Sequence, residues 1–352
     1  MQRRALALIS GGLDSMLAAR LMQEQGIAVE GVNFYTGFCV EGHTHAIRNA
    51  HGDKPKRNNA LWVAETLGIP LHIVDVSEDY KRIVLNPQHG YGAHLNPCLD
   101  CKIYMLGQAS LFLNRARQLA CDAGLDFIVT GEVAGQRPKS QRRKYLPLVA
   151  TESGVHDRVL RPLSAKLLEP TWPELQGWVD RERLYAFNGR SRQPQIALAR
   201  RFGLEDWAQP SGGCCFLTDE SYSRKLRDLW AARGRRDYQL DDILMLKIGR
   251  HLRPRPHFKL IIARDEGETH FLEGYRKDFT HLLPRSHRGA LCLVDGDLHA
   301  DDYELAARIV ARYSQGRDAG LVDIDIHTHG GAQHALRVQA CSADEIMQEW
   351  YV

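Results

Sequence analysis

The sequence lacks several features that define whole classes of protein. No apolar run approaches the ~18 residues that a membrane-spanning helix needs. The first residues lack the apolar segment and small-residue cleavage site of a signal peptide. No tract is compositionally biased, with 44% hydrophobic and 25% charged residues. These absences predict a globular, cytoplasmic protein with no membrane partner, and 352 residues are enough for two domains with separate cores.

The net charge is only +3, so the distribution of the charged residues along the chain is more informative than their sum. Basic residues gather in three stretches, at residues 137–144, 233–236 and 250–259. A single such stretch is as often a solvated surface as a binding site. Three together favour a phosphate-rich partner, and so a nucleic acid.

Strand-like and helix-like segments alternate over the first 130 residues. Buried-strand patterns occur at 5–9, 29–34, 71–76 and 127–130, and helical patterns at 15–25, 57–67 and 103–123. This alternation predicts an α/β fold, with a parallel sheet that carries helices on both faces. The order of the strands cannot be read from the sequence.

The rest of the chain changes character after a helical pattern at 222–233 that ends at Gly234. Short strands are expected beyond it at 243–248, 259–263, 270–273, 290–293 and 322–327, with an amphipathic helix at 301–313. We therefore predict a first domain at residues 1–230 and a smaller α+β domain at 235–352.

A glycine-rich turn, Ser-Gly-Gly-Leu-Asp-Ser at residues 10–15, joins the first strand to the first helix. Gly11 and Gly12 let the backbone approach a phosphate, and the helix start offers it unpaired N–H groups. The hydroxyls of Ser10 and Ser15 add donors, and Asp14 suits Mg²⁺ or an orienting role. No lysine follows the second glycine, which disfavours a P-loop kinase or GTPase. The turn predicts a nucleotide site, the alternative being an ordinary strand-to-helix turn.

Two other segments are expected to line the same site. Asn33 and Phe34 end the second predicted strand, and Thr130 and Gly131 end the fourth. Gln136 follows in a Gly-Gln-Arg-Pro loop. Ligands of α/β proteins bind at the carboxyl ends of the strands, which predicts that these residues contact the nucleotide.

Four of the eight cysteines form two pairs that are close together in the sequence, as metal-binding and redox cysteines are. Cys98 and Cys101 are three residues apart before a long helix, and Cys214 and Cys215 are adjacent after two glycines. Three interpretations remain open: structural Zn²⁺, a [4Fe–4S] cluster on three cysteines, and metal-free persulfide chemistry. Asp100 is a candidate general base, or else a helix cap.

These motifs resemble PP-loop enzymes that thiolate tRNA. The turn at residues 10–15 matches the family's SGGxDS signature, and Asn-Pro-Cys at 96–98 and Gly-Cys-Cys-Phe-Leu at 213–217 resemble the cysteine segments of 2-thiouridine synthetases. Asn-Pro-Cys-x-Asp-Cys at 96–101 is closer still to a group related to 4-thiouridine synthetases. From about residue 235 the chain resembles the RNA-binding module of NFACT proteins, on Leu-Lys-Ile-Gly-Arg-His at 246–251.

The resemblance implies an adenine nucleotide alpha hydrolase-like PP-loop domain. It implies an enzyme that uses ATP and Mg²⁺ to adenylate a carbonyl of a tRNA base, which sulfur from sulfide or a persulfide carrier then attacks. A [4Fe–4S] cluster would be held by Cys98, Cys101 and either Cys214 or Cys215. Only nine residues precede the turn here, whereas 4-thiouridine synthetases have a THUMP domain there.

Rival functions are an amidotransferase or ligase that uses ammonia, a cluster-dependent desulfidase, and a non-catalytic RNA-binding factor. The sequence names neither the nucleoside, nor the sulfur donor, nor the oligomeric state.

Overall fold

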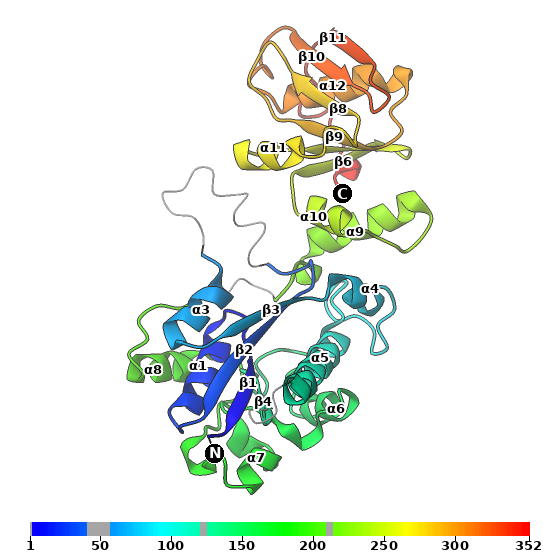
Figure 1. Ribbon diagram of the computed structural model, residues 1–352. Helices are drawn as coiled ribbons and strands as arrows, with labels where there is room; N and C mark the ends of the chain where they lie inside the picture. The colour runs from blue at the N-terminus through cyan, green and yellow to red at the C-terminus, as the bar shows by residue number, and fades with distance from the viewer. Residues whose placement is uncertain (1, 41–56, 120–124, 209–213) are drawn as a thin grey trace. The chain divides into compact units, whose positions relative to one another are not determined.

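The computed structural model describes residues 2–40, 57–119, 125–208 and 214–352 (Figure 1). By their contacts they divide into two compact units, one of residues up to Cys39 together with Arg57–Thr218 and one containing Asp219–Val352. In this part of the chain no helix is both long and apolar enough to cross a membrane.

The first unit is built on a five-stranded sheet whose pairings are all parallel. Its strands lie in the order β3-β2-β1-β4-β5. They are β1 (Arg4–Leu8), β2 (Ala28–Tyr35), β3 (Leu71–Asp75), β4 (Phe127–Val129) and β5 (Val159–Leu160). The predicted α/β class is confirmed, and four of the five strands lie where the sequence patterns predict them.

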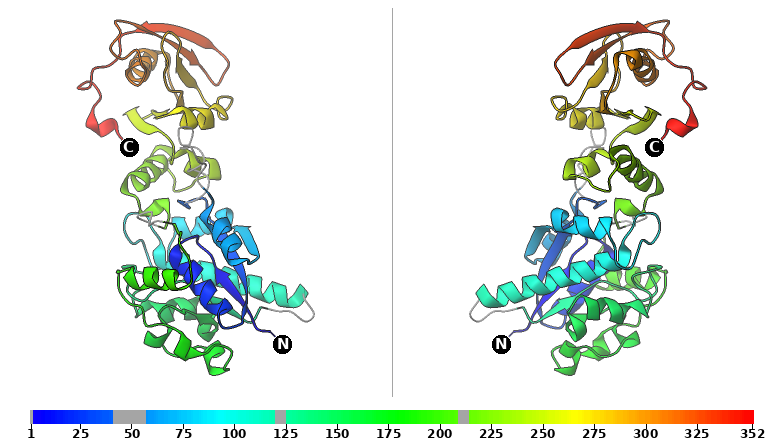
Figure 2. Two further views of the ribbon diagram at one scale, coloured as in Figure 1. Left: turned by 90° about the vertical axis from the view of Figure 1, so that its left-hand side faces the viewer. Right: turned by 90° about the vertical axis from the view of Figure 1, so that its right-hand side faces the viewer.

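Helices cover both faces of this sheet (Figures 1 and 2). One face carries α1 (Leu13–Gln23), α3 (Asn59–Leu67) and α8 (Gln193–Arg201). The other carries α5 (Cys98–Leu119) and α6 (Tyr145–Glu152). Successive residues of a strand point to opposite faces, so in β1 Ala5 packs into the first core and Leu6 into the second.

Two helical segments of this unit differ from expectation. Helix α4 (Ser77–Leu85) was not predicted, whereas the short α7 (Trp172–Leu175) lies in the stretch from about 159 to 202 whose sequence pattern is helical and irregular. Helix α5 begins at Cys98, five residues earlier than the apolar periodicity indicates, so the two cysteines lie in its first turn. Short 3₁₀ turns occur at 156–158, 165–167, 181–183 and 216–218.

The second unit contains a six-stranded antiparallel sheet in the order β11-β10-β8-β9-β7-β6. Its strands are β6 (Arg250–Arg255), β7 (Phe258–Ile262), β8 (His281–Pro284), β9 (Cys292–Gly296), β10 (Val322–His327) and β11 (Gln333–Val338). Its helices are α9 (Glu220–Arg233), α10 (Leu240–Met245), α11 (Glu266–Glu273) and α12 (Tyr303–Arg312), with 3₁₀ turns at 300–302 and 348–350. The predicted helix at 301–313 and strand at 322–327 are confirmed.

Two strand predictions in this unit were wrong. Residues 243–245 belong to α10, which ends at Met245, and residues 270–273 belong to α11. Both helices carry an N-terminal signal that outweighs their short apolar runs. The Asp265 side chain accepts the backbone N–H of Glu268 at 2.9 Å, and that of Asp242 accepts the N–H of Gln239 at 2.7 Å.

Helix α9 packs within the second unit, although the predicted boundary at 230–235 assigns it to the first domain. The Tyr222 hydroxyl donates to the carbonyl of Ile243 at 2.8 Å, and Lys225 Nζ donates to that of Leu246 at 3.2 Å. The boundary between independently folding domains stays a prediction.

Candidate functional site

The glycine-rich turn occupies the switch point of the parallel sheet. From β1 the chain proceeds to β2 and β3 on one side, whereas β4 pairs on the other side of β1. Connections that leave in opposite directions open a crevice at the carboxyl ends of the strands, where ligands of such sheets bind. Residues 10–12 of the turn lie in the loop between β1 and α1 at that crevice, and residues 13–15 begin α1.

The turn is held in shape by its own serines. The Ser15 hydroxyl donates to the carbonyl of Gly12 at 2.8 Å, and the backbone N–H of Ser10 donates to Ser15 Oγ at 3.3 Å. Gly11 has φ of +81°, a conformation that glycine adopts without strain. Ser15 therefore shapes the loop from within, a role beyond the phosphate contact predicted for it.

Gly131 brings the end of β4 against the turn. A Cβ at this position would lie 2.4 Å from the carbonyl carbon of Asp14 and from the backbone N of Ser15. Only glycine permits this approach, because backbone atoms at that distance cannot rotate away. The neighbouring Thr130 donates its hydroxyl to Glu132 at 3.2 Å, and Glu132 pairs with Arg161 at 2.9 Å.

Asp14 lies in the first turn of α1 beside polar groups from two distant segments. Its Oδ2 accepts a hydrogen bond from Gln136 Nε2 at 2.8 Å. Burial raises the pKa of Asp14, against the opposing effects of Gln136 and of the charges on Arg192 and Arg137. The structure therefore brings the predicted Asp14 and Gln136 together. It adds Arg192, which no sequence motif indicated.

The predicted residues of β2 have more structural contacts. Asn33 Nδ2 donates to the carbonyl of Ile9 at 2.6 Å and so ties β2 to the start of the turn. Phe34 is half-buried and packs against the core beneath α5. Their contact with a nucleotide stays a prediction.

Cys98 and Cys101 are held by separate polar partners. The Cys98 thiol donates to Ser140 Oγ at 3.0 Å. Burial raises the pKa of Cys101 to about 12, with a contribution from nearby Cys214, while a hydrogen bond from Tyr80 opposes the rise. Tyr80 belongs to the unpredicted helix α4, so its role could not be found from the sequence.

The adjacent Cys214 and Cys215 differ sharply in acidity. A hydrogen bond from Cys215 lowers the pKa of Cys214 to about 5, and the charges of Arg137 and Lys102 add to this effect. The same hydrogen bond raises the pKa of Cys215 well above that of a free thiol. Cys214 is exposed and Cys215 half-buried. Arg137 thus acts electrostatically on both Asp14 and Cys214, which links the turn to the thiols.

Alkylation of native protein with iodoacetamide tests this difference. At pH 7 we expect Cys214 to react at least tenfold faster than Cys101, because only the thiolate is nucleophilic. The rate at Cys214 should fall as the pH drops through about 5, where its thiolate becomes protonated. Mass spectrometry of peptides sampled over time measures both rates. Equal rates at the two cysteines would contradict the assignment.

Cys39 is a further thiol at this site, and no motif in the sequence marks it. It follows β2 in the chain and forms an antiparallel bridge with Cys215. The adjoining backbone N–H of Phe216 donates to the carbonyl of Phe38 at 2.9 Å. No spacing rule connects residues 39 and 215, so only the fold could reveal the pair.

The thiols do not form a metal centre in this arrangement. Within the described ranges no three Cys, His, Asp or Glu side chains are placed to hold one metal ion. Cys98 is instead hydrogen-bonded to Ser140, and Cys101 to Tyr80. Cys215 is hydrogen-bonded to Cys214. The donor set does not fit a cluster as it stands, so no chemical step is derived through one.

Asp100 has clear structural contacts. Its carboxylate accepts the backbone N–H groups of Gln88 at 2.7 Å and of His89 at 3.1 Å. These bonds hold the loop before α5, so the buried Asp100 carboxylate binds loop N–H groups and not the end of a helix. Its role as a general base stays a prediction.

Several residues of two of the basic stretches, 137–144 and 250–259, form contacts inside the protein. Lys139 Nζ donates to the carbonyls of His89 and Tyr91, both at 3.1 Å. Arg253 pairs with Asp228 at 2.5 Å, and the buried Lys259 pairs with Asp228 at 3.2 Å. The clusters are therefore weaker evidence for a nucleic acid partner than their sequence density indicates.

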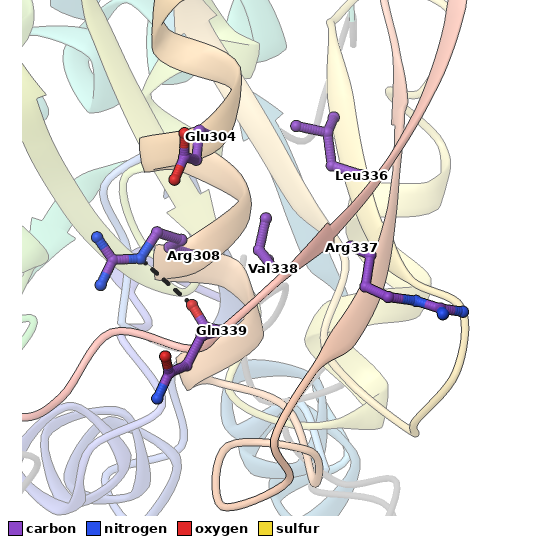
Figure 3. A pocket seen from close by; sticks show the side chains of 6 residues that line it. All are labelled: Glu304, Arg308, Leu336, Arg337, Val338 and Gln339. Atoms are coloured by element: carbon purple, nitrogen blue, oxygen red, sulfur yellow. Dashed lines mark hydrogen bonds between the residues drawn. The ribbon is translucent and has the colours of Figure 1, made fainter.

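The second unit also has a cavity of about 480 Å³. Figure 3 shows it between α12, which supplies Glu304 and Arg308, and the strand that ends at Val338. Arg308 Nε donates to the carbonyl of Gln339 at 3.3 Å, whereas Arg337 points away and binds Asp323. No cysteine lines this cavity.

Comparisons with known proteins follow the two-unit division. Residues 3–157 match the family described as tRNA methyl transferase HUP domain, and residues 249–351 match the NFACT protein RNA binding domain. The tRNA-specific 2-thiouridylase MnmA of Symbiobacterium thermophilum is 29% identical over 64% of this chain and 55% of its own length. That of Syntrophus aciditrophicus is 28% identical over 65% and 56%. The chain resembles tRNA thiolation enzymes.

The resemblance to tRNA thiolation enzymes covers only part of each relative's sequence. The chain spans only about half the length of these curated relatives. A solved 4-thiouridine synthetase–RNA complex with bound ATP is 25% identical over 46% of this chain and 37% of that one. Its TM-score of 0.32 is too low to establish a shared fold.

Proposed function

We propose that the protein is an ATP-dependent tRNA sulfurtransferase. The observation that carries the proposal is that the loop after β4 contacts both the nucleotide-type turn and a thiol: Gln136 donates to Asp14 at 2.8 Å, and Ser140 accepts from Cys98 at 3.0 Å. The similarity to 2-thiouridylases supports tRNA as the acceptor. An amidotransferase that uses ammonia would not need the thiols.

ATP would bind with its phosphates over Gly11 and Gly12, where the start of α1 offers N–H groups. The base carbonyl oxygen attacks the α-phosphate and pyrophosphate leaves, so the oxygen becomes part of a good leaving group. Sulfur then attacks the activated carbon and AMP departs. Arg137, which lies within electrostatic range of Asp14 and Cys214, would offset the negative charge that develops.

Asp14 would hold Mg²⁺, which offsets phosphate charge when bound. The [4Fe–4S] cluster predicted on Cys98, Cys101 and Cys215 or Cys214 stays a proposal, and the arrangement of the thiols favours metal-free chemistry instead. Anaerobic purification with iron and sulfide quantitation decides between the two. About four irons per chain would support the cluster, and less than one would rule it out.

Two assays test the function. ATP and unmodified tRNA should give pyrophosphate and AMP with the purified protein. Mass spectrometry of nucleosides from a deletion strain should show one thiolated nucleoside missing. An unchanged nucleoside profile together with no pyrophosphate release would overturn the proposal.

Binding of tRNA should depend strongly on salt. Phosphate contacts release condensed counterions, so log K falls linearly with log salt, by about 0.7–0.9 per contact. We expect at least tenfold weaker binding at 200 mM than at 50 mM salt, measured by fluorescence anisotropy. A variant with Arg235 and Arg236 changed to Ala should reduce the slope, whereas Glu65→Gln, at an exposed position of α3, should not. A salt-independent affinity would contradict tRNA binding through phosphates.

A further inference from the structure

Cys39 and Cys215 lie opposite each other on two antiparallel segments. The bridge between them is of the non-hydrogen-bonded type, because the hydrogen bond runs from Phe216 N to Phe38 O, one residue outside the pair on each segment. Side chains at such positions point to the same side and approach more closely than at hydrogen-bonded positions. Directly opposite residues have Cβ atoms about 4.5–5.5 Å apart, close to the 3.5–4.5 Å that a disulfide spans.

The surroundings keep both residues in register and leave their sulfurs able to react. The carbonyl of Cys215 accepts the Thr218 hydroxyl at 2.7 Å and the Thr218 N–H at 3.1 Å, which fixes the backbone. Cys39 Sγ lies 3.6 Å from Thr36 Oγ1. Neither thiol is in a disulfide and both are half-buried, with Cys215 hydrogen-bonded to the adjacent Cys214. By contrast, Cys98 lies in a helix and donates to Ser140 at 3.0 Å.

We propose that Cys39 is the resolving thiol for Cys215 in sulfur transfer, closing a cross-strand disulfide with it. This inference rests on the proposed sulfurtransferase function. It assigns a reaction partner to Cys215 that no sequence motif indicates.

The chemistry balances without a metal. A persulfide donor transfers its terminal sulfur to Cys215 and leaves as a thiol. The Cys39 thiolate then attacks Cys215 Sγ, so a Cys39–Cys215 bond forms and the bond to the terminal sulfur breaks. That sulfur leaves with the electron pair as hydrosulfide and attacks the adenylated carbon. The sulfane sulfur is reduced by two electrons, the two cysteines are oxidised by two, and a dithiol reductant restores them.

Disulfide mapping tests the pairing independently of catalysis. Full-length protein is treated with diamide, blocked with iodoacetamide, digested without reduction and analysed by mass spectrometry. We expect a peptide pair joined through Cys39 and Cys215. A link from Cys98 or Cys101 to Cys214 or Cys215, with Cys39 alkylated, would overturn the proposal.

Single-turnover sulfur transfer tests the role. Protein loaded with persulfide sulfur is mixed with ATP and tRNA without reductant, and thiolated nucleoside is measured. Cys39→Ser should lower the yield at least tenfold, and dithiothreitol should restore it by releasing the sulfur from Cys215. Cys341→Ala, which removes a buried thiol of the second unit outside the site, should transfer at the wild-type level. If Cys39→Ser transferred sulfur to tRNA at the wild-type level without added dithiothreitol, Cys39 would not be the resolving thiol.

Failure of the proposed function has a separate signature. Wild-type protein would then produce neither pyrophosphate nor thiolated nucleoside, while diamide would still join Cys39 to Cys215. A joined pair with an active Cys39→Ser variant would instead reject only the resolving role.

Discussion

Replacing Asp14 with Asn should lower ATP cleavage by roughly 100-fold or more, the usual effect of removing one preorganised electrostatic group from a reacting centre. The side chain lies at the start of α1 and is hydrogen-bonded by Gln136 at 2.8 Å. Asparagine keeps the shape and an acceptor for Gln136 but removes the charge that would bind Mg²⁺. Pyrophosphate release in the presence of tRNA measures the loss.

The same substitution should not destabilise the fold. Burial raises the pKa of Asp14, so the folded state disfavours its ionised form relative to the unfolded chain. Above the unfolded pKa that charge therefore reduces stability, and its removal should leave the melting temperature equal or higher. Exposed Glu65→Gln is the matched control, expected to change neither quantity. Activity within tenfold of wild type would exclude Asp14 from the reaction.

The sequence predicts the strand-to-helix turn at residues 10–15 well because the determinants of that turn are local. Strand, glycines and helix follow one another within about twenty residues, and each has a pattern of its own. The cap signals of α10 and α11 are equally local, and Asp265 followed three residues later by Glu268 is a helix-start pattern for α11. In both segments the cap, and not the short apolar run, decides the secondary structure.

The thiol environment could not be predicted, because its determinants are distant in the chain. Tyr80 reaches Cys101 from α4, Arg137 acts on Cys214 from the loop after β4, and Cys39 meets Cys215 across 176 positions. A single sequence has no signal for such pairings. It can indicate reactive residue types, whereas acidity and partnership depend on packing.

Gly131→Ala should destabilise the protein strongly. The new Cβ would lie 2.4 Å from Asp14 C and Ser15 N, which are backbone atoms, so β4 and α1 must move apart. Overpacking of this kind costs about 1–3 kcal/mol, and the rigid neighbours favour the upper end. For a unit of this size we expect a fall in melting temperature of roughly 6–12 °C. Differential scanning calorimetry gives the shift, and ATP binding should weaken with it.

Gly12→Ala is the comparison variant, because it adds a methyl group to the same turn without a steric clash. Its φ is −85°, and a Cβ there would lie 3.6 Å from Ser10 Oγ, an ordinary contact. The melting temperature should stay within about 2 °C of wild type, because Gly→Ala costs little where the backbone is allowed. ATP binding should nevertheless fall at least tenfold, since the methyl group occupies the space a phosphate needs beside the backbone. If Gly12→Ala bound ATP normally, the turn would be only a structural strand-to-helix connection. If Gly131→Ala melted like wild type, β4 would not pack against the turn as described.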